Sequence, residues 1–267
     1  MIEAIQFEFI QKALIAGFLV SIICGVIGTL VVVNRLTFLA GGIAHTAYGG
    51  IGLAFYFKWP YMACTILFSI FAAMIMGAVT INDRHRSDTI IGVLWALGMA
   101  LGVILTDLSP GYNVDLMSYL FGSILAVTSV DLLGMFIVTV VIVGVVIWFY
   151  HYYWAMAYDE EFAKLRGVPV KKLYFLLLGM IAIAIIMAMR VVGLILVIAL
   201  LTIPPYIAEK RCRSLFGTMF FSGLLSALFI LTGLWSSYTF NLPAGASIIM
   251  TAGLGFFLSF FLSKWAK

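Results

Sequence analysis

Long apolar stretches alternate with short polar clusters along the chain, and this alternation predicts its class. A helix needs about 20 apolar residues to cross a bilayer, with a working range of roughly 17–25. Nine stretches qualify, near residues 9–33, 39–57, 60–81, 89–107, 132–150, 173–189, 192–208, 215–235 and 244–262. The pattern predicts an all-α integral membrane protein, a polytopic bundle of about eight or nine transmembrane helices.

The stretch between Asp115 and Asp131 is too short to be counted with these spans. It holds 15 residues, and Ser118, Ser123 and Thr128 are among them. Irregular backbone at membrane depth is tolerated only where it is buried in protein or lines a cavity. We therefore predict a re-entrant segment near 115–131.

Composition supports the membrane assignment, and charge placement orients the chain. Of 267 residues, 64% are hydrophobic and only 10% are charged, whereas soluble domains average about 25% charged residues. With nine spans and a re-entrant 115–131, 12 of the 15 lysines and arginines fall on one side. Basic loops stay in the cytoplasm, so the N-terminus is expected outside. We expect a multi-pass protein of the cytoplasmic (inner) membrane, with one membrane domain over residues 1–267.

Catalytic signatures are missing from the sequence. There is no G-x-x-x-x-G-K-[ST] phosphate loop and no dinucleotide fingerprint. There is no H-E-x-x-H pair and no G-x-S-x-G elbow. The three cysteines form neither a metal-type pair nor a disulfide framework. No basic tail suggests nucleic acid. We expect a transport subunit and not an enzyme.

The second span carries an ionisable group on a glycine face. Gly42, His45, Gly49 and Gly52 follow spacings of 3, 4 and 3, which place them on one side of a helix. Glycines let a second backbone approach closely, and imidazole is a common ligand of first-row transition metals. His45 is therefore a candidate metal contact on a pathway. The alternative is a histidine that hydrogen-bonds across a helix interface.

The longest polar segment, 158–172, predicts a short cytoplasmic helix. Asp159 and Glu160 lie at its positive end, Phe162 and Ala163 follow, and Gly167 ends it. Phe162, Leu165 and Val168 form an apolar stripe. Two interpretations remain open: a helix that rests on the membrane surface, and a docking element for a cytoplasmic partner.

A proline pair interrupts the stretch 192–208. Pro204 and Pro205 both lack the backbone N–H that a helix uses. Broken or kinked helices often line transport routes. A static kink needed for packing is an equal alternative.

These segments, in this order, resemble the membrane permease subunits of ABC importers for zinc, manganese and iron, typified by the bacterial high-affinity zinc uptake permease. The resemblance covers nearly the whole chain. It rests on residues 35–52 (RLTFLAGGIAHTAYGGIG), 88–92, 114–122, 125–128, 159–167, 192–208 and 242–246. Each motif alone is weak, but their joint order and spacing are specific.

The resemblance implies a set of partners and a division of labour. Two permease copies would form a homodimer around a central pathway. Two copies of a separate ATP-binding subunit would dock partly on Asp159–Gly167, and an extracellular or periplasmic metal-binding protein would deliver the cation. The cargo would be a divalent transition metal, with zinc expected first and manganese or iron as alternatives. No stably bound cofactor is implied.

One position departs from the family pattern D-x-x-x-H. The residue four before His45 is Gly41, where many members have aspartate. A site without that carboxylate is softer and less negative. Two other functions remain open: a permease for a metal chelate, and a membrane scaffold without transport.

Overall fold

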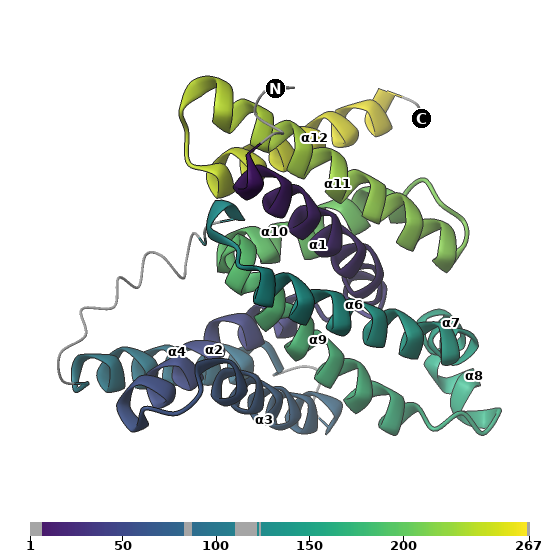
Figure 1. The fold of residues 1–267 in the computed structure, drawn as a ribbon. Helices are drawn as coiled ribbons and strands as arrows, with labels where there is room; N and C mark the ends of the chain where they lie inside the picture. The colour runs from purple at the N-terminus through teal and green to yellow at the C-terminus, as the bar shows by residue number, and fades with distance from the viewer. Residues whose placement is uncertain (1–6, 83–86, 110–121, 123, 266–267) are drawn as a thin grey trace. The chain divides into compact units, whose positions relative to one another are not determined.

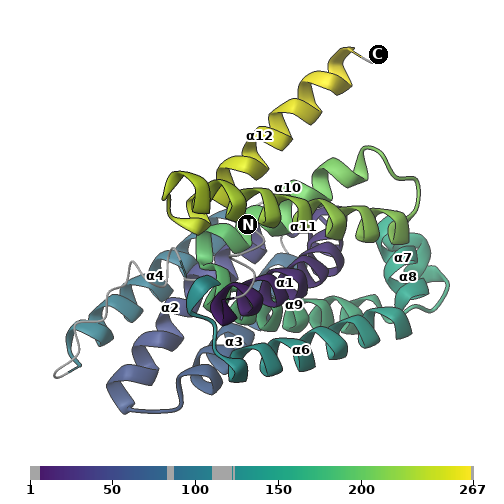
Figure 2. The same ribbon diagram turned by 45° about the horizontal axis from the view of Figure 1, so that its top comes forward.

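The described part of the chain is helical throughout. The computed structural model describes residues 7–82, 87–109, 122 and 124–265. Eight of its helices are long and apolar enough to cross a membrane by length and composition. They are α1 (Glu8–Val33), α2 (Thr37–Phe57), α3 (Tyr61–Asn82), α4 (Ser87–Asp107), α6 (Ser129–Trp148), α9 (Val170–Val192), α11 (Leu215–Phe240) and α12 (Ala244–Trp265). The predicted fold class is confirmed (Figures 1 and 2).

Four shorter elements complete the described chain: η2 (Ile124–Ala126), α7 (Tyr150–Tyr158), α8 (Glu160–Leu165) and α10 (Leu194–Glu209). The predicted span 192–208 corresponds to α10, which has 16 residues and is shorter than the other apolar helices. Most of the predicted re-entrant segment 115–131 lies outside the described residues. Its end contains η2 and the first turn of α6.

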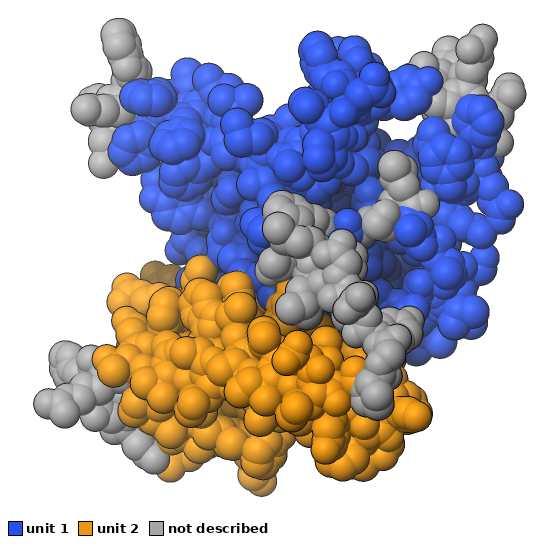
Figure 3. All heavy atoms as spheres, turned by 90° about the vertical axis from the view of Figure 1, so that its left-hand side faces the viewer, with its two compact units in different colours: residues 1–34, 117–150, 187–267 blue, residues 35–116, 151–186 orange. Residues whose placement is uncertain are grey.

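The chain divides into two compact units (Figure 3). In the first, which comprises residues 1–34, 117–150 and 187–267, α1 packs against α6, α10 and α11. Helix α12 packs on α10 and α11. In the second, which comprises residues 35–116 and 151–186, α2 packs between α3 and α4. Gly77 of α3 lies against Leu178 of α9 in the same unit.

Several helix ends are capped by polar side chains from the loops. Thr128 and Asp131 form a reciprocal capping box at the start of α6. The Ser214 hydroxyl accepts the Gly217 N–H at the start of α11. Such caps satisfy backbone donors that a helix leaves unpaired. Lys58 and Asn241 end α2 and α11 in the left-handed conformation.

Contacts between helix ends agree with the topology deduced from charge. Arg190, at the end of α9, lies 2.7 Å from Asp131, at the start of α6. The Tyr150 hydroxyl accepts the Phe216 N–H at the start of α11 (3.1 Å). The deduced topology puts the first pair outside and the second pair inside, so in each case the joined ends belong to the same side.

Candidate functional site

The predicted glycine face of α2 makes close contacts with α3 and α4. A Cβ added at Gly52 would lie 2.6 Å from the Gly102 oxygen of α4, and one at Gly49 would meet the Phe68 ring of α3 at 2.6 Å. A Cβ at Gly42 would lie 2.5 Å from Ile91 of α4. At Gly52 the obstacle is backbone, so a side chain there would separate α2 from α4. At Gly42 and Gly49 the nearest obstacles are side chains of the neighbouring helices.

Gly41 differs from the other glycines of this helix. A Cβ added there would meet nothing within 4 Å, although the residue itself is buried. Gly92 of α4 likewise has open space where a side chain would begin. The position where the family pattern has aspartate can therefore accommodate a side chain one turn before His45.

His45 lies on α2 beside α4. Its ring stacks on Trp95, with centroids 4.0 Å apart and planes inclined by 12°. The buried Nδ1 atom of His45 has no hydrogen-bond partner among the described residues. The neighbouring Thr46 hydroxyl donates to the Gly42 oxygen at 2.7 Å. The imidazole is thus held by ring stacking, and one ring nitrogen is left without a protein donor or acceptor.

Trp95 is the site residue that sequence reasoning missed. Its indole N–H donates to the Met99 sulfur at 3.0 Å, so the ring that stacks on His45 is itself held by the next turn of α4. The only sequence signal is the spacing of four between Trp95 and Met99, which places both on one helix face. Nothing in the sequence pairs that face with His45.

The predicted segment 158–172 contains a short helix, α8, which covers Glu160–Leu165 only. The Asp159 carboxylate accepts the Phe162 N–H at 3.0 Å and caps the helix. Glu160 pairs with Lys164 at 2.6 Å. Gly167 has φ +79°, the left-handed conformation that ends a helix and favours glycine. The helix is therefore short because both of its ends are specified locally.

The apolar residues of α8 face in different directions. Phe162 and Leu165 are 54% and 86% exposed, whereas Ala163 is 1% exposed. The Arg166 guanidinium lies over the Phe162 ring, 5.4 Å from its centre. Ala163 thus belongs to the chain's own packing, and the Phe162–Leu165 side is the surface that α8 presents outward.

Helix α7 is fixed to α9 by a buried tyrosine. Tyr153 is fully buried, and its hydroxyl donates to the Leu173 oxygen at 3.5 Å. Burial raises the pKa of the Tyr153 phenol above its usual value. The hydroxyl therefore stays protonated and remains a donor that links the two helices flanking α8.

The proline pair lies inside α10, which stays helical through both residues. Proline at 205 cannot donate to the Leu201 carbonyl one turn earlier. A Cβ added at Gly28 of α1 would lie 2.8 Å from that same oxygen and 2.9 Å from Cγ of Pro205. The prolines therefore form part of a close contact between α1 and α10.

The predicted site residues are divided between the two units. His45 and its glycines lie in the second unit, as does α8, whereas Pro204 and Pro205 lie in the first. In the part of the chain that the structure describes, no group of three or more His, Cys, Asp or Glu side chains is arranged to hold a metal ion.

The helical bundle and the eight candidate spans of the described chain are those of a polytopic membrane protein. Residues 6–263 match the ABC 3 transport family. The chain belongs to this family, and the resemblance to permeases of metal-uptake ABC transporters is confirmed.

Individual relatives match over almost the whole chain. An uncharacterized membrane protein of Synechocystis sp. is 44% identical and covers 97% of this chain and 92% of its own. A probable metal transport system membrane protein of Chlamydia pneumoniae is 34% identical, with coverage of 91% and 85%. The manganese transport system membrane protein MntC of Listeria monocytogenes is 31% identical, with coverage of 96% and 91%.

Solved structures agree with the fold. PsaBC from Streptococcus pneumoniae, solved in complex with Fab, has a chain that superposes with a TM-score of 0.87 at 32% identity. The match covers 97% of this chain and 94% of that one. A putative metal-chelate type ABC transporter in an inward-facing conformation superposes with a TM-score of 0.73 at 17% identity, covering 94% and 85%. The second likeness concerns the fold alone.

Proposed function

We propose that this permease moves a divalent transition-metal cation into the cell and that the cation passes the His45 ring. The single observation that carries this proposal is the buried Nδ1 atom of His45, which has no hydrogen-bond partner among the described residues. A histidine kept only for a hydrogen bond across helices would use its ring nitrogens for that bond. A neutral imidazole with an available nitrogen is a transition-metal ligand.

Manganese and zinc are the two cargoes to separate. Relatives in Listeria carry names of manganese transport proteins, whereas sequence motifs alone led us to expect zinc first. The ligand chemistry at His45 suits either ion, because imidazole binds most first-row divalent metals. Manganese prefers carboxylate and other oxygen ligands, and the position one turn before His45 is glycine. We therefore propose a divalent first-row metal, with the choice between the two ions left to measurement.

The chain is proposed to work as one half of a homodimer with two copies of a separate ATP-binding subunit. A metal-binding protein outside the membrane would deliver the cation. Support for the ATPase contact comes from α8, whose Phe162 and Leu165 side chains are exposed next to each other on a capped helix. Asp159, Glu160 and Gly167 shape that helix, and Ala163 anchors it within the permease.

The experiment on transport measures uptake of radioactive manganese and zinc by cells that lack the chromosomal gene and express single variants. His45→Ala should reduce uptake at limiting metal while membrane insertion is unchanged. His45→Gln should not restore uptake, because an amide keeps hydrogen bonds but is a much poorer transition-metal ligand. Uptake at the wild-type rate by the His45→Gln protein would overturn direct coordination.

Restoring the family carboxylate supplies a companion test. The open space at Gly41 allows Gly41→Asp to be accommodated, with its carboxylate one turn before the imidazole. We expect this variant to insert normally and to shift preference toward manganese, because carboxylate oxygen suits that ion. Gly41→Asn is the matched control, since it adds nearly the same volume without the charge. The same preference in both variants would contradict the proposal.

The experiment on coupling uses Phe162→Glu and Phe162→Leu. A charge on the exposed face should prevent recovery of the ATP-binding subunit with the permease, whereas leucine should preserve it. Ala163 is unsuitable for this purpose, because a charge at a buried position disturbs the permease itself. Normal recovery of the ATPase with Phe162→Glu would leave α8 as a helix that rests on the membrane surface.

A further inference from the structure

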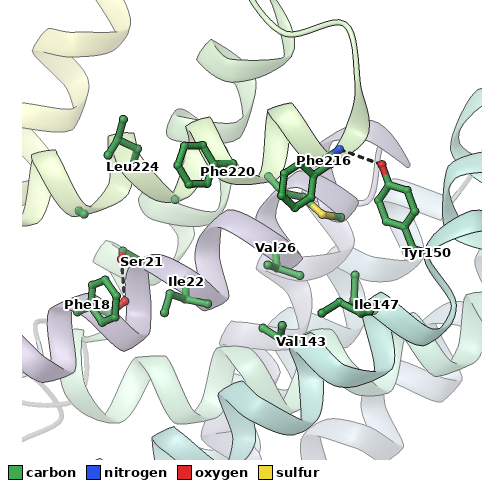
Figure 4. Close-up of a pocket in the computed structure, with 14 residues that line it drawn as sticks. Phe18, Ser21, Ile22, Val26, Val143, Ile147, Tyr150, Phe216, Phe220 and Leu224 are labelled. Atoms are coloured by element: carbon green, nitrogen blue, oxygen red, sulfur yellow. Dashed lines mark hydrogen bonds between the residues drawn. The ribbon is translucent and has the colours of Figure 1, made fainter.

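An apolar groove of about 360 Å³ runs along the first unit between α1, α6 and α11. Figure 4 shows Phe18 and Leu224 toward one end and Tyr150 and Phe216 at the other. Ile22, Val143, Ile147 and Phe220 line the length between them. The volume falls within the range of small-molecule sites, roughly 300–1,000 Å³.

The chemistry of the groove fits a long apolar ligand. Its polar lining atoms are already paired: the Ser21 hydroxyl donates to the Phe18 oxygen at 2.7 Å, and the Tyr150 hydroxyl accepts the Phe216 N–H at 3.1 Å. The remaining side chains are hydrocarbon or aromatic, apart from the thioether of Met219. The lining holds no carboxylate, imidazole or thiol, so it offers a divalent cation no charged or imidazole ligand.

The length of the groove matches one leaflet of a bilayer. Along α11 it extends from Phe216 to Ala227, and 11 residues at 1.5 Å per residue rise about 16 Å. Half of the hydrocarbon core is about 15 Å thick. The Tyr150–Phe216 end lies on the expected cytoplasmic side, so the groove spans the inner leaflet.

Positive charge precedes the groove at that cytoplasmic end. The turn before α11 contains Lys210, Arg211 and Arg213, and both arginines are exposed. Lys210 lies over the Tyr206 ring, 4.2 Å from its centre. From residue 210 to the end of α11 there is no acidic residue. Basic residues next to a membrane surface attract anionic lipid headgroups.

We propose that the groove binds one acyl chain of an anionic phospholipid of the inner leaflet, with its phosphate at Arg211 and Arg213. A second copy of the chain is a poorer occupant, because a two-fold contact presents the same patch from both subunits and that patch includes the basic turn. The lipid chain fills the space beside α1, which packs directly on both α6 and α11.

The experiment compares phosphatidylglycerol with phosphatidylcholine of identical acyl chains, offered to purified protein in a mild detergent. Bound lipid is counted by native mass spectrometry. Each arginine near the surface contributes about 1 kcal/mol toward an anionic lipid. We therefore expect wild-type protein to retain phosphatidylglycerol roughly thirtyfold better, the ratio that about 2 kcal/mol corresponds to. The double variant Arg211→Gln/Arg213→Gln should bind the two lipids equally.

A second set of variants tests the groove itself. Ala227→Phe and Val143→Phe place a ring in the groove and should abolish retention of either lipid. Leu231→Phe, at an exposed position on α11 outside the groove, is the matched control and should bind as wild type does. Equal retention of the two lipids by wild-type protein overturns the proposal. If the groove variants fail to fold, the Arg211→Gln/Arg213→Gln variant still allows the two lipids to be compared. Conversion of a dimer to a monomer by Ala227→Phe also overturns it, because the occupant would then be a second copy.

Discussion

The contact between Gly52 of α2 and Gly102 of α4 offers the sharpest test of how the second unit is held together. An alanine at 52 would place its Cβ 2.6 Å from the Gly102 oxygen and 2.8 Å from the Gly102 Cα. At 102 a Cβ would meet the Tyr48 carbonyl more closely still. Both obstacles are backbone atoms, which cannot rotate away.

Two opposing effects determine how much each substitution changes the free energy of unfolding. Replacing a helical glycine by alanine favours the helix by about 1 kcal/mol. Overpacking a tight interface costs about 1–3 kcal/mol. Because the obstacles at these two sites are backbone atoms, we expect a cost near the upper end of that range. We expect a net loss of roughly 1 kcal/mol for Gly52→Ala and roughly 2 kcal/mol for Gly102→Ala. Because the two sites touch, the double variant should lose less than the sum of the single variants.

Matched controls are present on the same two helices. Gly92→Ala on α4 and Gly41→Ala on α2 add a Cβ where nothing lies within 4 Å, so they should be neutral or stabilising by up to about 1 kcal/mol. A change of about 1 kcal/mol in the free energy of unfolding shifts the melting temperature by about 2–4 °C in a chain of this size. Gly102→Ala should therefore melt roughly 5–10 °C below Gly92→Ala.

The assay is thermal unfolding of the purified permease in detergent at one fixed scan rate, because irreversible unfolding makes the midpoint depend on the rate. Variants are compared only with each other and with wild type under that protocol. Equal melting temperatures for Gly102→Ala and Gly92→Ala would refute the close backbone contact between α2 and α4.

Three further predictions follow from other contacts. Trp95→Phe should keep a ring against His45 and support metal uptake, whereas Trp95→Leu should reduce uptake without changing the melting temperature; equal uptake by both would remove the stacking from the mechanism. Asp131→Ala should lower thermal stability by about 1–2 kcal/mol, because it removes a helix cap worth about 1 kcal/mol and an ion pair worth about 0–1 kcal/mol. Arg190→Gln, which keeps the cap, should cost less, and the reverse order would contradict this assignment. Burial raises the pKa of Tyr153, so the folded state holds its proton more tightly than the unfolded chain. Stability should therefore fall as pH rises above about 10, the usual tyrosine pKa, and Tyr153→Phe should lose less over that interval than wild type in thermal scans against pH.

Sequence reasoning succeeded where a local pattern has one physical meaning. The spacing of Gly42, Gly49 and Gly52 placed them on one face, and each faces a neighbouring helix in the structure. It did not separate these glycines from Gly41, because composition cannot show whether a partner helix lies opposite. Trp95 was not predicted for the same reason. Its contact with His45 depends on how α2 and α4 pair, and a single sequence does not show that pairing.

In the short helix at 160–165, too, local features were predictable from the sequence and contacts were not. Asp159 and Gly167 predict its two ends, because capping and a left-handed stop are local effects. The apolar stripe does not show whether another part of the chain covers Phe162, so its exposure could not be predicted. Ala163 is small and gives no periodic signal, yet it is the buried residue of the helix.

The side of the membrane on which each loop lies stays a prediction, and it rests on charge and not on contacts. Lysines and arginines near spans stay on the cytoplasmic side, so a count over the loops orients every helix. The structure joins Asp131 to Arg190 and Tyr150 to Phe216, and both pairs connect helix ends that the count assigns to a common side. The break between α9 and α10 was predicted from the sequence, between the stretches 173–189 and 192–208, but its exact position was not. It occurs at Gly193 with φ +83°, where Gly122 packs so closely that a Cβ on it would collide with the Gly193 nitrogen. Residues 71 positions apart are thus in close backbone contact where one helix ends and the next begins, and in lipid such contacts between small residues are a principal source of helix association.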